Sequence, residues 1–187
     1  QLRLSLADSA ARILPDDGLD VIVLACTSGT VAVGEEAACA ELVKGAPGAK
    51  ATTLAGAVRK ALMAIGARKI VLGSPYIPEL NDNVAAYFEN AGYEMLGVHG
   101  MGLHYDTDMI RVDPEYIVDF GRAIDRPDAD AVLLSCGALR SIDVIDRIED
   151  ELGKPAICSN QAMLWDCLRL AGVGDQLEGL GSLLRDH

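Results

Sequence analysis

The sequence predicts an α/β protein whose parallel, doubly wound sheets form two lobes of similar design. Short aliphatic runs alternate with amphipathic segments along the 187 residues, as expected when each strand is followed by a helix. Two of these runs, 21–25 and 131–135, are almost entirely apolar, which is typical of strands buried on both faces. Half of the residues are hydrophobic and only 4% are aromatic, so we expect an aliphatic core.

Strands are expected where short apolar runs end at small or polar residues. In chain order they lie at 21–25, in a short extended stretch after Pro47, and at 69–73, 93–98, 131–135 and 156–158.

Helices are expected where apolar residues recur at helical spacing after a capping residue. Residues 2–14 read as the end of a helix, and helices at 34–44 and 54–65 follow, the second with Gly66 as its C-terminal cap. Later helices should start at Asn81, at Asp113 with Pro114, at Ser141 and at Asn160, and a Gly-rich loop at 100–108 should lie between the first two of these.

The strands and helices fall into two comparable series. We assign residues 1–66, together with 174–187, to an incomplete N-terminal lobe and residues 67–173 to a C-terminal lobe. The chain starts within what reads as the end of a helix, so we expect an N-terminal piece to be missing from it. Ligands bind outside the carboxyl ends of parallel strands, which makes the ends of 21–25 and 131–135 candidate site walls.

Charge and cysteine usage narrow the class of partner. The 16 basic and 28 acidic side chains give a net charge of −12, which repels phosphate backbones, so we expect no nucleic acid partner. No apolar run approaches the roughly 20 residues of a membrane span, and no export signal is recognisable. Five cysteines without a CxxC pair argue against disulfides and structural zinc, and favour a reducing cytoplasm.

Two turns place a cysteine directly after a buried strand. They read Val23-Leu-Ala-Cys26-Thr-Ser-Gly-Thr30 and Leu133-Leu-Ser-Cys136-Gly-Ala-Leu-Arg-Ser141. A thiol in such a turn lies near free backbone N–H groups, which favour the thiolate. Small neighbours let the oxygens of a carboxylate approach the same N–H groups; these neighbours include Thr27, Ser28, Gly137 and Ala138.

The alternative is that the cysteines only fill space, because free cysteine is among the most buried residue types. The matching positions of Cys26 and Cys136, one in each lobe, favour chemistry for this pair. Cys39, Cys158 and Cys167 lie at positions where packing is the better interpretation. His99 and His104 are expected in a surface or hinge loop and not in a metal site.

These turns resemble the two catalytic motifs of the maleate isomerase and arylmalonate decarboxylase branch of the aspartate/glutamate racemase superfamily. Gly73-Ser-Pro-Tyr76 is similar to the tyrosine-bearing turn of that branch, and the segments 111–115 and 154–165 match it as well. The resemblance runs from about Asp20 to Gly172. It implies that the first βα unit of the family, of roughly 50 residues, is missing from this chain. It extends to racemase-like proteins of ectoine utilisation.

The resemblance implies two Rossmann-like lobes related by a pseudo-twofold, a site in the cleft between them, and no metal, nucleotide or pyridoxal cofactor. It implies that Cys26 and Cys136 face each other across a small carboxylate. In a racemase one thiolate would remove the α-proton and the other thiol would return one to the opposite face. In a maleate isomerase Cys26 would add to the double bond and Cys136 would act as the acid. Relatives usually form homodimers or larger assemblies, which we also expect here.

The resemblance also assigns the carboxylate contacts. Tyr76 matches the tyrosine that hydrogen-bonds a substrate carboxylate, and backbone N–H groups at Thr27, Ser28, Gly137 and Ala138 would add to it. Maleate isomerases contribute an asparagine from the region that reads 99–108 here. Without that asparagine the second carboxylate of maleate loses a partner.

The leading interpretation is a cofactor-independent isomerase or racemase of a small carboxylate, dicarboxylate or amino acid. Arylmalonate decarboxylases keep only the second cysteine, so the alternative of a decarboxylase predicts that Cys136 alone is required. A third hypothesis is a non-catalytic carboxylate-binding protein, which predicts stabilisation by the ligand without turnover.

Overall fold

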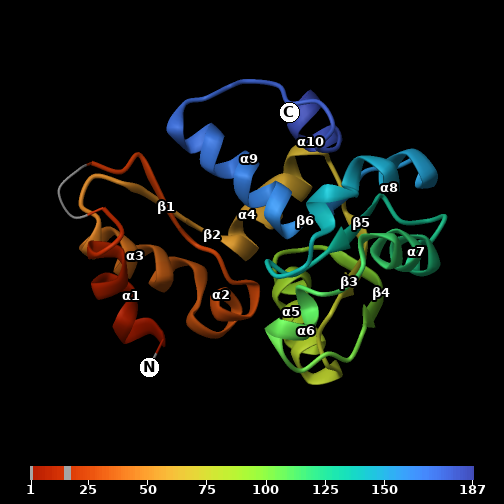
Figure 1. Cartoon of the computed structure of the whole chain (residues 1–187), viewed down its shortest axis with the longest axis horizontal. Helices are drawn as coiled ribbons and strands as arrows, with labels where there is room; N and C mark the ends of the chain where they lie inside the picture. Colours follow the sequence, from red (N-terminus) through yellow and green to blue (C-terminus); the bar gives the residue numbers. More distant parts are fainter. Residues whose placement is uncertain (1, 15–17) are drawn as a thin grey trace.

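The computed structural model describes residues 2–14 and 18–187, and its strands form two parallel sheets (Figure 1). The smaller sheet pairs β1 (Val21–Leu24) with β2 (Lys50–Thr53). The larger sheet has the order β4–β3–β5–β6, formed by β3 (Lys69–Ser74), β4 (Glu94–Gly100), β5 (Ala131–Leu134) and β6 (Ala156–Cys158). The predicted α/β class and the parallel pairing are confirmed.

Helices α1 (Leu2–Ala11) and α3 (Glu35–Gly45) pack together beside the smaller sheet. Their small apolar core includes Leu6, Ile22 and Leu42. The segment between β1 and α3 was expected to be a turn, yet it forms α2 (Thr27–Val33). This helix starts at residue 27 because the side chain of Cys26 takes the N-cap position.

The larger sheet forms the main core. It is surrounded by α4 (Leu54–Ala64), α5 (Pro78–Asn90), the short α6 (Asp106–Met109), α7 (Pro114–Ile124), a 3-10 turn at Ser141–Asp143, α8 (Ile145–Leu152), α9 (Ser159–Ala171) and α10 (Ser182–Asp186). The largest fully buried side chains are aliphatic apart from Phe88, as the composition indicates. The core therefore consists mainly of closely packed Leu, Ile and Val.

Of the four predicted N-terminal helix caps, one is confirmed and three are wrong. Asp113 accepts a hydrogen bond from the Glu115 N–H at 2.8 Å and precedes Pro114 at the first helical position. The other three lie inside a helix or turn: Asn81 is in α5, Ser141 opens the 3-10 turn, and Asn160 is the second residue of α9. Asn81 and Asn160 bond to neighbouring loops instead of the start of their own helix.

Helix α9 is attached to both sheets. Near its N-terminus it continues directly from β6. Further along, the buried Asp166 carboxylate accepts hydrogen bonds from Thr52 of β2 at 2.5 Å and from Lys60 of α4 at 2.8 Å. The contact joins the C-terminal part of the chain to the smaller sheet.

The proposed division into lobes 1–66 with 174–187, and 67–173, stays a prediction. In the structure the last segment contacts α8 and α9: Ser182 donates to the Glu149 carboxylate, and Leu183 joins the core of the larger sheet. Among the described helices none is long and apolar enough to cross a membrane.

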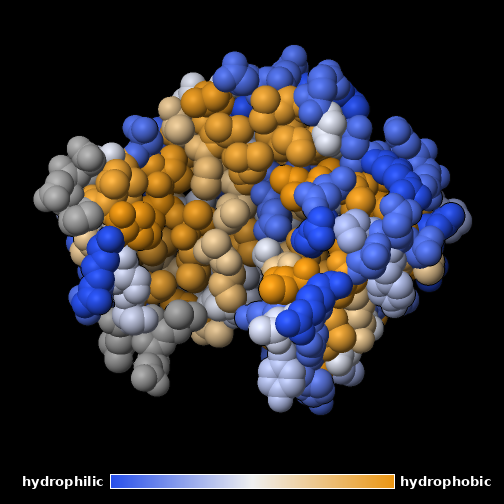
Figure 2. Space-filling model, viewed as in Figure 1, coloured by the Kyte–Doolittle hydropathy of each residue, from blue (hydrophilic) through white to orange (hydrophobic). Residues whose placement is uncertain are grey.

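The surface differs between the two halves of the molecule. Figure 2 shows hydrophobic side chains gathered over β1, β2 and the adjoining part of α9, while hydrophilic ones cover α7 and α8. The same view shows the molecule hollowed between α2 on one side and α5 and α6 on the other. The carboxyl ends of β1 and β5 point towards this region.

Candidate active site

One cavity of about 300 Å³ brings together every residue that the sequence predicted for the site. Residues from the end of β1, the loop after β3, α6 and the loop after β5 surround it. Its lining consists of Ala25, Cys26, Thr27, Ser28, Tyr76, Asp106, Cys136, Gly137 and Ala138. Each sheet therefore contributes one thiol to a single space.

Cys26 follows β1 and caps α2. Its sulfur accepts a hydrogen bond from the Gly29 N–H at 3.2 Å and lies 3.5 Å from the Ser28 hydroxyl. Donors of this kind stabilise negative charge on sulfur. The side chain is partly exposed to the cavity, so a small molecule can reach it.

Cys136 follows β5 and is only 5% exposed. Its φ of +156° lies in a region that residues other than glycine rarely adopt, which indicates a backbone held by its surroundings. Burial raises the pKa of the thiol above its ordinary value, although the Tyr76 hydroxyl and the N–H groups of Ala138 and Leu139 oppose that effect. Cys136 is therefore a neutral thiol at neutral pH, the form that can donate a proton.

Two residues of α9 hold the loop that carries Cys136. The Cys136 N–H donates to the Ser159 hydroxyl at 3.1 Å. The Asn160 side-chain amide donates to the carbonyls of Gly137 and Leu139 at 3.1 and 3.2 Å. The sequence indicated Asn160 as a cap residue, because its loop partners lie more than 20 positions away.

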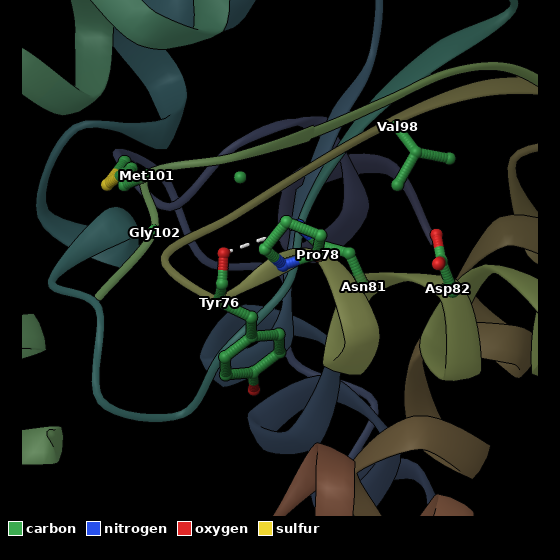
Figure 3. Close-up of a pocket in the computed structure, with 8 residues that line it drawn as sticks. Tyr76, Pro78, Asn81, Asp82, Val98, Met101 and Gly102 are labelled. Atoms are coloured by element: carbon green, nitrogen blue, oxygen red, sulfur yellow. Dashed lines mark hydrogen bonds between the residues drawn. The ribbon is translucent and has the colours of Figure 1, made fainter. Parts of the chain in front are cut away.

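Tyr76 lies between the two thiols and a second pocket. Its ring is buried, and burial together with the neighbouring Cys136 raises the pKa of the phenol, which stays protonated. Figure 3 shows the ring pointing away from the second pocket, a space of about 260 Å³, while the Tyr76 carbonyl faces Asn81. Asn81 donates to that carbonyl and accepts from Ser74, so the turn holds the phenol at the cavity that contains Cys26 and Cys136.

Comparison with known proteins identifies the family. A sequence profile described as arylmalonate decarboxylase matches residues 4–184. Arylmalonate decarboxylase from Bordetella bronchiseptica is 36% identical over 174 residues, which cover 91% of this chain and 72% of that protein. The chain belongs to the arylmalonate decarboxylase family. Maleate isomerase from Geobacillus stearothermophilus is 28% identical over 186 residues, covering 95% of this chain and 74% of the relative.

Solved structures of the family share the fold. A crystal structure of arylmalonate decarboxylase superposes with a TM-score of 0.87 at 32% identity, covering 98% of this chain and 82% of that one. Nocardia farcinica maleate cis-trans isomerase bound to TRIS gives 0.84 at 25% identity, covering 98% and 74%. A Cys-to-Ser mutant of that isomerase contains a covalently bound succinylcysteine intermediate. The expected resemblance and the two-lobed Rossmann-like fold are confirmed.

The remaining cysteines and the histidines lie outside the cavity. Cys158 is buried at the start of α9, where burial raises its pKa to about 12. Burial also raises the pKa values of Cys39 and Cys167, which are half-buried. His99 and His104 are exposed, but His99 was wrongly expected in a loop: it lies in β4, and only His104 lies in the loop that follows. None of these side chains lines the space between Cys26 and Cys136.

The structure adds one charged residue that sequence reasoning did not assign to the site. Asp106, the first residue of α6, lines the cavity together with both thiols. In the sequence it lies in the Gly-rich segment 100–108, 30 positions from Cys136 and without any motif around it. Only the folding of this segment across the end of the larger sheet brings Asp106 to the site.

Proposed function

We propose that this protein is a cofactor-independent isomerase or racemase that acts on a small carboxylate through Cys26 and Cys136. The observation that carries the proposal is that two thiols from different sheets open into the same cavity. A small carbon centre placed between them is accessible from both faces. The relatives include maleate isomerases, and the name of those enzymes describes an isomerisation of a small carboxylate.

In a racemisation the two thiols exchange roles within one turnover. The Cys26 thiolate removes the proton from the α-carbon and becomes a thiol, and the electron pair moves onto the substrate carboxylate. The Cys136 thiol then gives its proton to the opposite face of the carbon and becomes the thiolate. Proton count and charge are conserved, and the reverse reaction starts from the product state.

In a cis-trans isomerisation the same groups act by addition. The Cys26 sulfur forms a bond to one alkene carbon while Cys136 protonates the other, which leaves a single bond that rotates. In the elimination the Cys136 thiolate takes the proton back, the C–S bond breaks, and the Cys26 sulfur leaves with the electron pair as a thiolate. The contacts of Cys26 with donors and the protonated state of Cys136 support these assignments.

The substrate carboxylate needs hydrogen-bond donors near the thiols. The N–H groups of Thr27 and Ser28 belong to the first turn of α2, which has no preceding helical carbonyl to bond. The Thr27 hydroxyl is buried without a hydrogen bond of normal geometry in the described chain. These donors, the Tyr76 phenol and the backbone at Gly137 and Ala138 are the carboxylate contacts that we propose.

A second candidate is decarboxylation of a disubstituted malonate. It is favoured by the 36% identity with the Bordetella bronchiseptica decarboxylase. In that reaction carbon dioxide leaves the malonate and Cys136 alone protonates the remaining carbanion. The two proposals can be distinguished by experiment, because isomerisation or racemisation requires Cys26 and decarboxylation does not.

The test is proton NMR in D₂O with maleate, aspartate, glutamate, 2,4-diaminobutyrate and phenylmalonate. Loss of an α-proton signal indicates racemisation, formation of fumarate indicates isomerisation, and formation of phenylacetate indicates decarboxylation. We expect Cys26→Ser and Cys136→Ser each to lower the rate by about 10³-fold or more, because a hydroxyl is a far weaker acid than a thiol. Cys39→Ser is the matched control and should keep the rate.

A decarboxylase would lose activity with Cys136→Ser and keep it with Cys26→Ser. Near-full activity of both variants would refute a two-thiol mechanism. Ligand-induced stabilisation without turnover, with both thiols slow to alkylate, would instead favour the carboxylate-binding protein.

We also propose a reducing cytoplasm as the compartment, because all five cysteines are free and the mechanism needs two of them as thiols. A homodimer or larger assembly stays a proposal, and light scattering of the purified protein tests it.

A further inference from the structure

Among the described residues that line the cavity, Asp106 is the only one with a carboxylate side chain. The other lining residues, within the described chain, are small or neutral, and none of them is Lys, Arg or His. Before any substrate enters, the fixed charge of the site is therefore negative. This is unusual for a site whose substrate contains a carboxylate.

No cation neutralises Asp106. Within residues 2–14 and 18–187 its carboxylate forms no ion pair, and the nearby charged neighbour on α6, Asp108, is also acidic. The protein as a whole has a net charge of −12. The charge of Asp106 reaches the reacting groups, since it contributes to the raised pKa of Cys136.

This charge discriminates between substituents on the substrate. One carboxylate can be held by the backbone donors at Thr27, Ser28, Gly137 and Ala138, as proposed above. A second carboxylate near Asp106 would be repelled by the like charge of its side chain. An ammonium group at the same place would be attracted and would form a charge-assisted hydrogen bond.

We infer that Asp106 selects a substrate that has an ammonium group beside its carboxylate, that is, an amino acid, over dicarboxylates such as maleate or malonates. The inference rests on the proposed function, whose reaction it narrows to racemisation. The ammonium group also makes the neighbouring C–H bond more acidic, which assists removal of the proton by a thiolate. A zwitterion adds no net charge to a cavity that already contains a carboxylate and a thiolate.

The competing interpretation is that Asp106 is only a solvated residue at the start of a short helix. Its exposed position is compatible with that role. Asp108 provides the matched control, because it lies on the same four-residue helix, is exposed and does not line the cavity. If negative charge on α6 acts on ligands in a general way, both Asp106→Asn and Asp108→Asn should change ligand binding. If Asp106 contacts the ligand directly, only Asp106→Asn should change it.

The experiment measures protection of Cys26 from iodoacetamide, with the modified residue identified by peptide mass. Two ligand pairs differ only in the ammonium group: L-alanine against propionate, and L-aspartate against succinate. We expect the amino acid of each pair to protect at a concentration at least 10-fold lower. Asp106→Asn should bring that ratio close to one, a loss of about 10-fold or more as expected for a hydrogen bond between charged groups, whereas Asp108→Asn should leave it unchanged.

Equal or better protection by propionate, succinate or maleate would overturn the inference. So would a ratio that Asp106→Asn does not change, or a lack of protection by either amino acid. Because protection needs no turnover, the two proposals can fail separately. Isomerisation of maleate through both thiols without an ammonium preference would retain the proposed function and refute the inference. A protein that prefers ligands with an ammonium group but needs neither thiol for turnover would retain the inference and refute the proposed function.

Discussion

Replacing Asn160 by alanine should loosen the loop of Cys136 while leaving Cys26 in place. The substitution removes the two hydrogen bonds from the side-chain amide to the carbonyls of Gly137 and Leu139. Each such bond contributes roughly 0.5–1.5 kcal/mol to the free energy of unfolding, so their sum is about 1–3 kcal/mol. Alanine is the better helix former, which returns up to about 0.7 kcal/mol and leaves a net loss of roughly 1.5 kcal/mol at the middle of the range.

For a chain of this size the loss corresponds to a fall in Tm of roughly 3–6 °C, which thermal unfolding followed by circular dichroism would measure. The local effect should be larger than the global one. Cys136 is 5% exposed because its loop is held closed, so we expect its alkylation by iodoacetamide to accelerate about 10-fold while that of Cys26 stays unchanged.

The matched control is Asn83→Ala in α5, where the asparagine is exposed and the same gain in helix propensity applies. It should leave both alkylation rates unchanged and should not lower Tm. The reasoning would be refuted if Asn160→Ala left the Cys136 rate at the wild-type value, since the loop would then be held by other contacts.

Three further outcomes follow from contacts in the structure. Tyr76→Phe removes a hydroxyl that lowers the pKa of Cys136, so the pH profile of Cys136 alkylation should move to higher pH; a shift to lower pH would contradict this. Asp166→Ala leaves Lys60 without its partner and should lower the free energy of unfolding in urea by about 2–4 kcal/mol; a loss below 1 kcal/mol would show a solvated pair. Gly73→Ala brings a Cβ to within 2.7 Å of a side chain of α7 and should cost about 1–3 kcal/mol by the same measurement, and unchanged stability would mean that α7 moves freely.

Much of the fold was predictable because parallel strands buried on both faces leave a clear pattern. The apolar runs at 21–25, 69–73 and 131–135 match β1, β3 and β5 within a residue or two. The ends of two of these runs also located both thiols, because a strand that ends in cysteine and small residues stands out from its surroundings.

The helix starts were harder to predict, for a physical reason. Asn and Ser are good caps, but their side chains bond equally well to a carbonyl or hydroxyl from a distant segment. Asn81 bonds Ser74 and Tyr76, and Asn160 bonds the loop after β5. Such choices depend on the packed structure and not on the local sequence.

The charged residue of the site, Asp106, could not be predicted from the sequence for the same reason: its position depends on the packed structure. The predicted residues of the cavity belong to motifs with small side chains, which local reasoning can recognise. Asp106 has no such context, and its position depends on how β4 and the following loop cross the end of the larger sheet. The residue that we infer to select the substrate is thus the one that the sequence does not indicate.

Helix α9 has a mechanical consequence for the distance between the two sulfurs. Ser159 at its start bonds the backbone of Cys136, and Asp166, about 10 Å further along the axis, bonds Thr52 of β2. β2 is paired in register with β1, whose end carries Cys26. Helix α9 therefore sets the distance between the two sulfurs, and a ligand of a different width would require this helix to tilt or its Asp166 contacts to break.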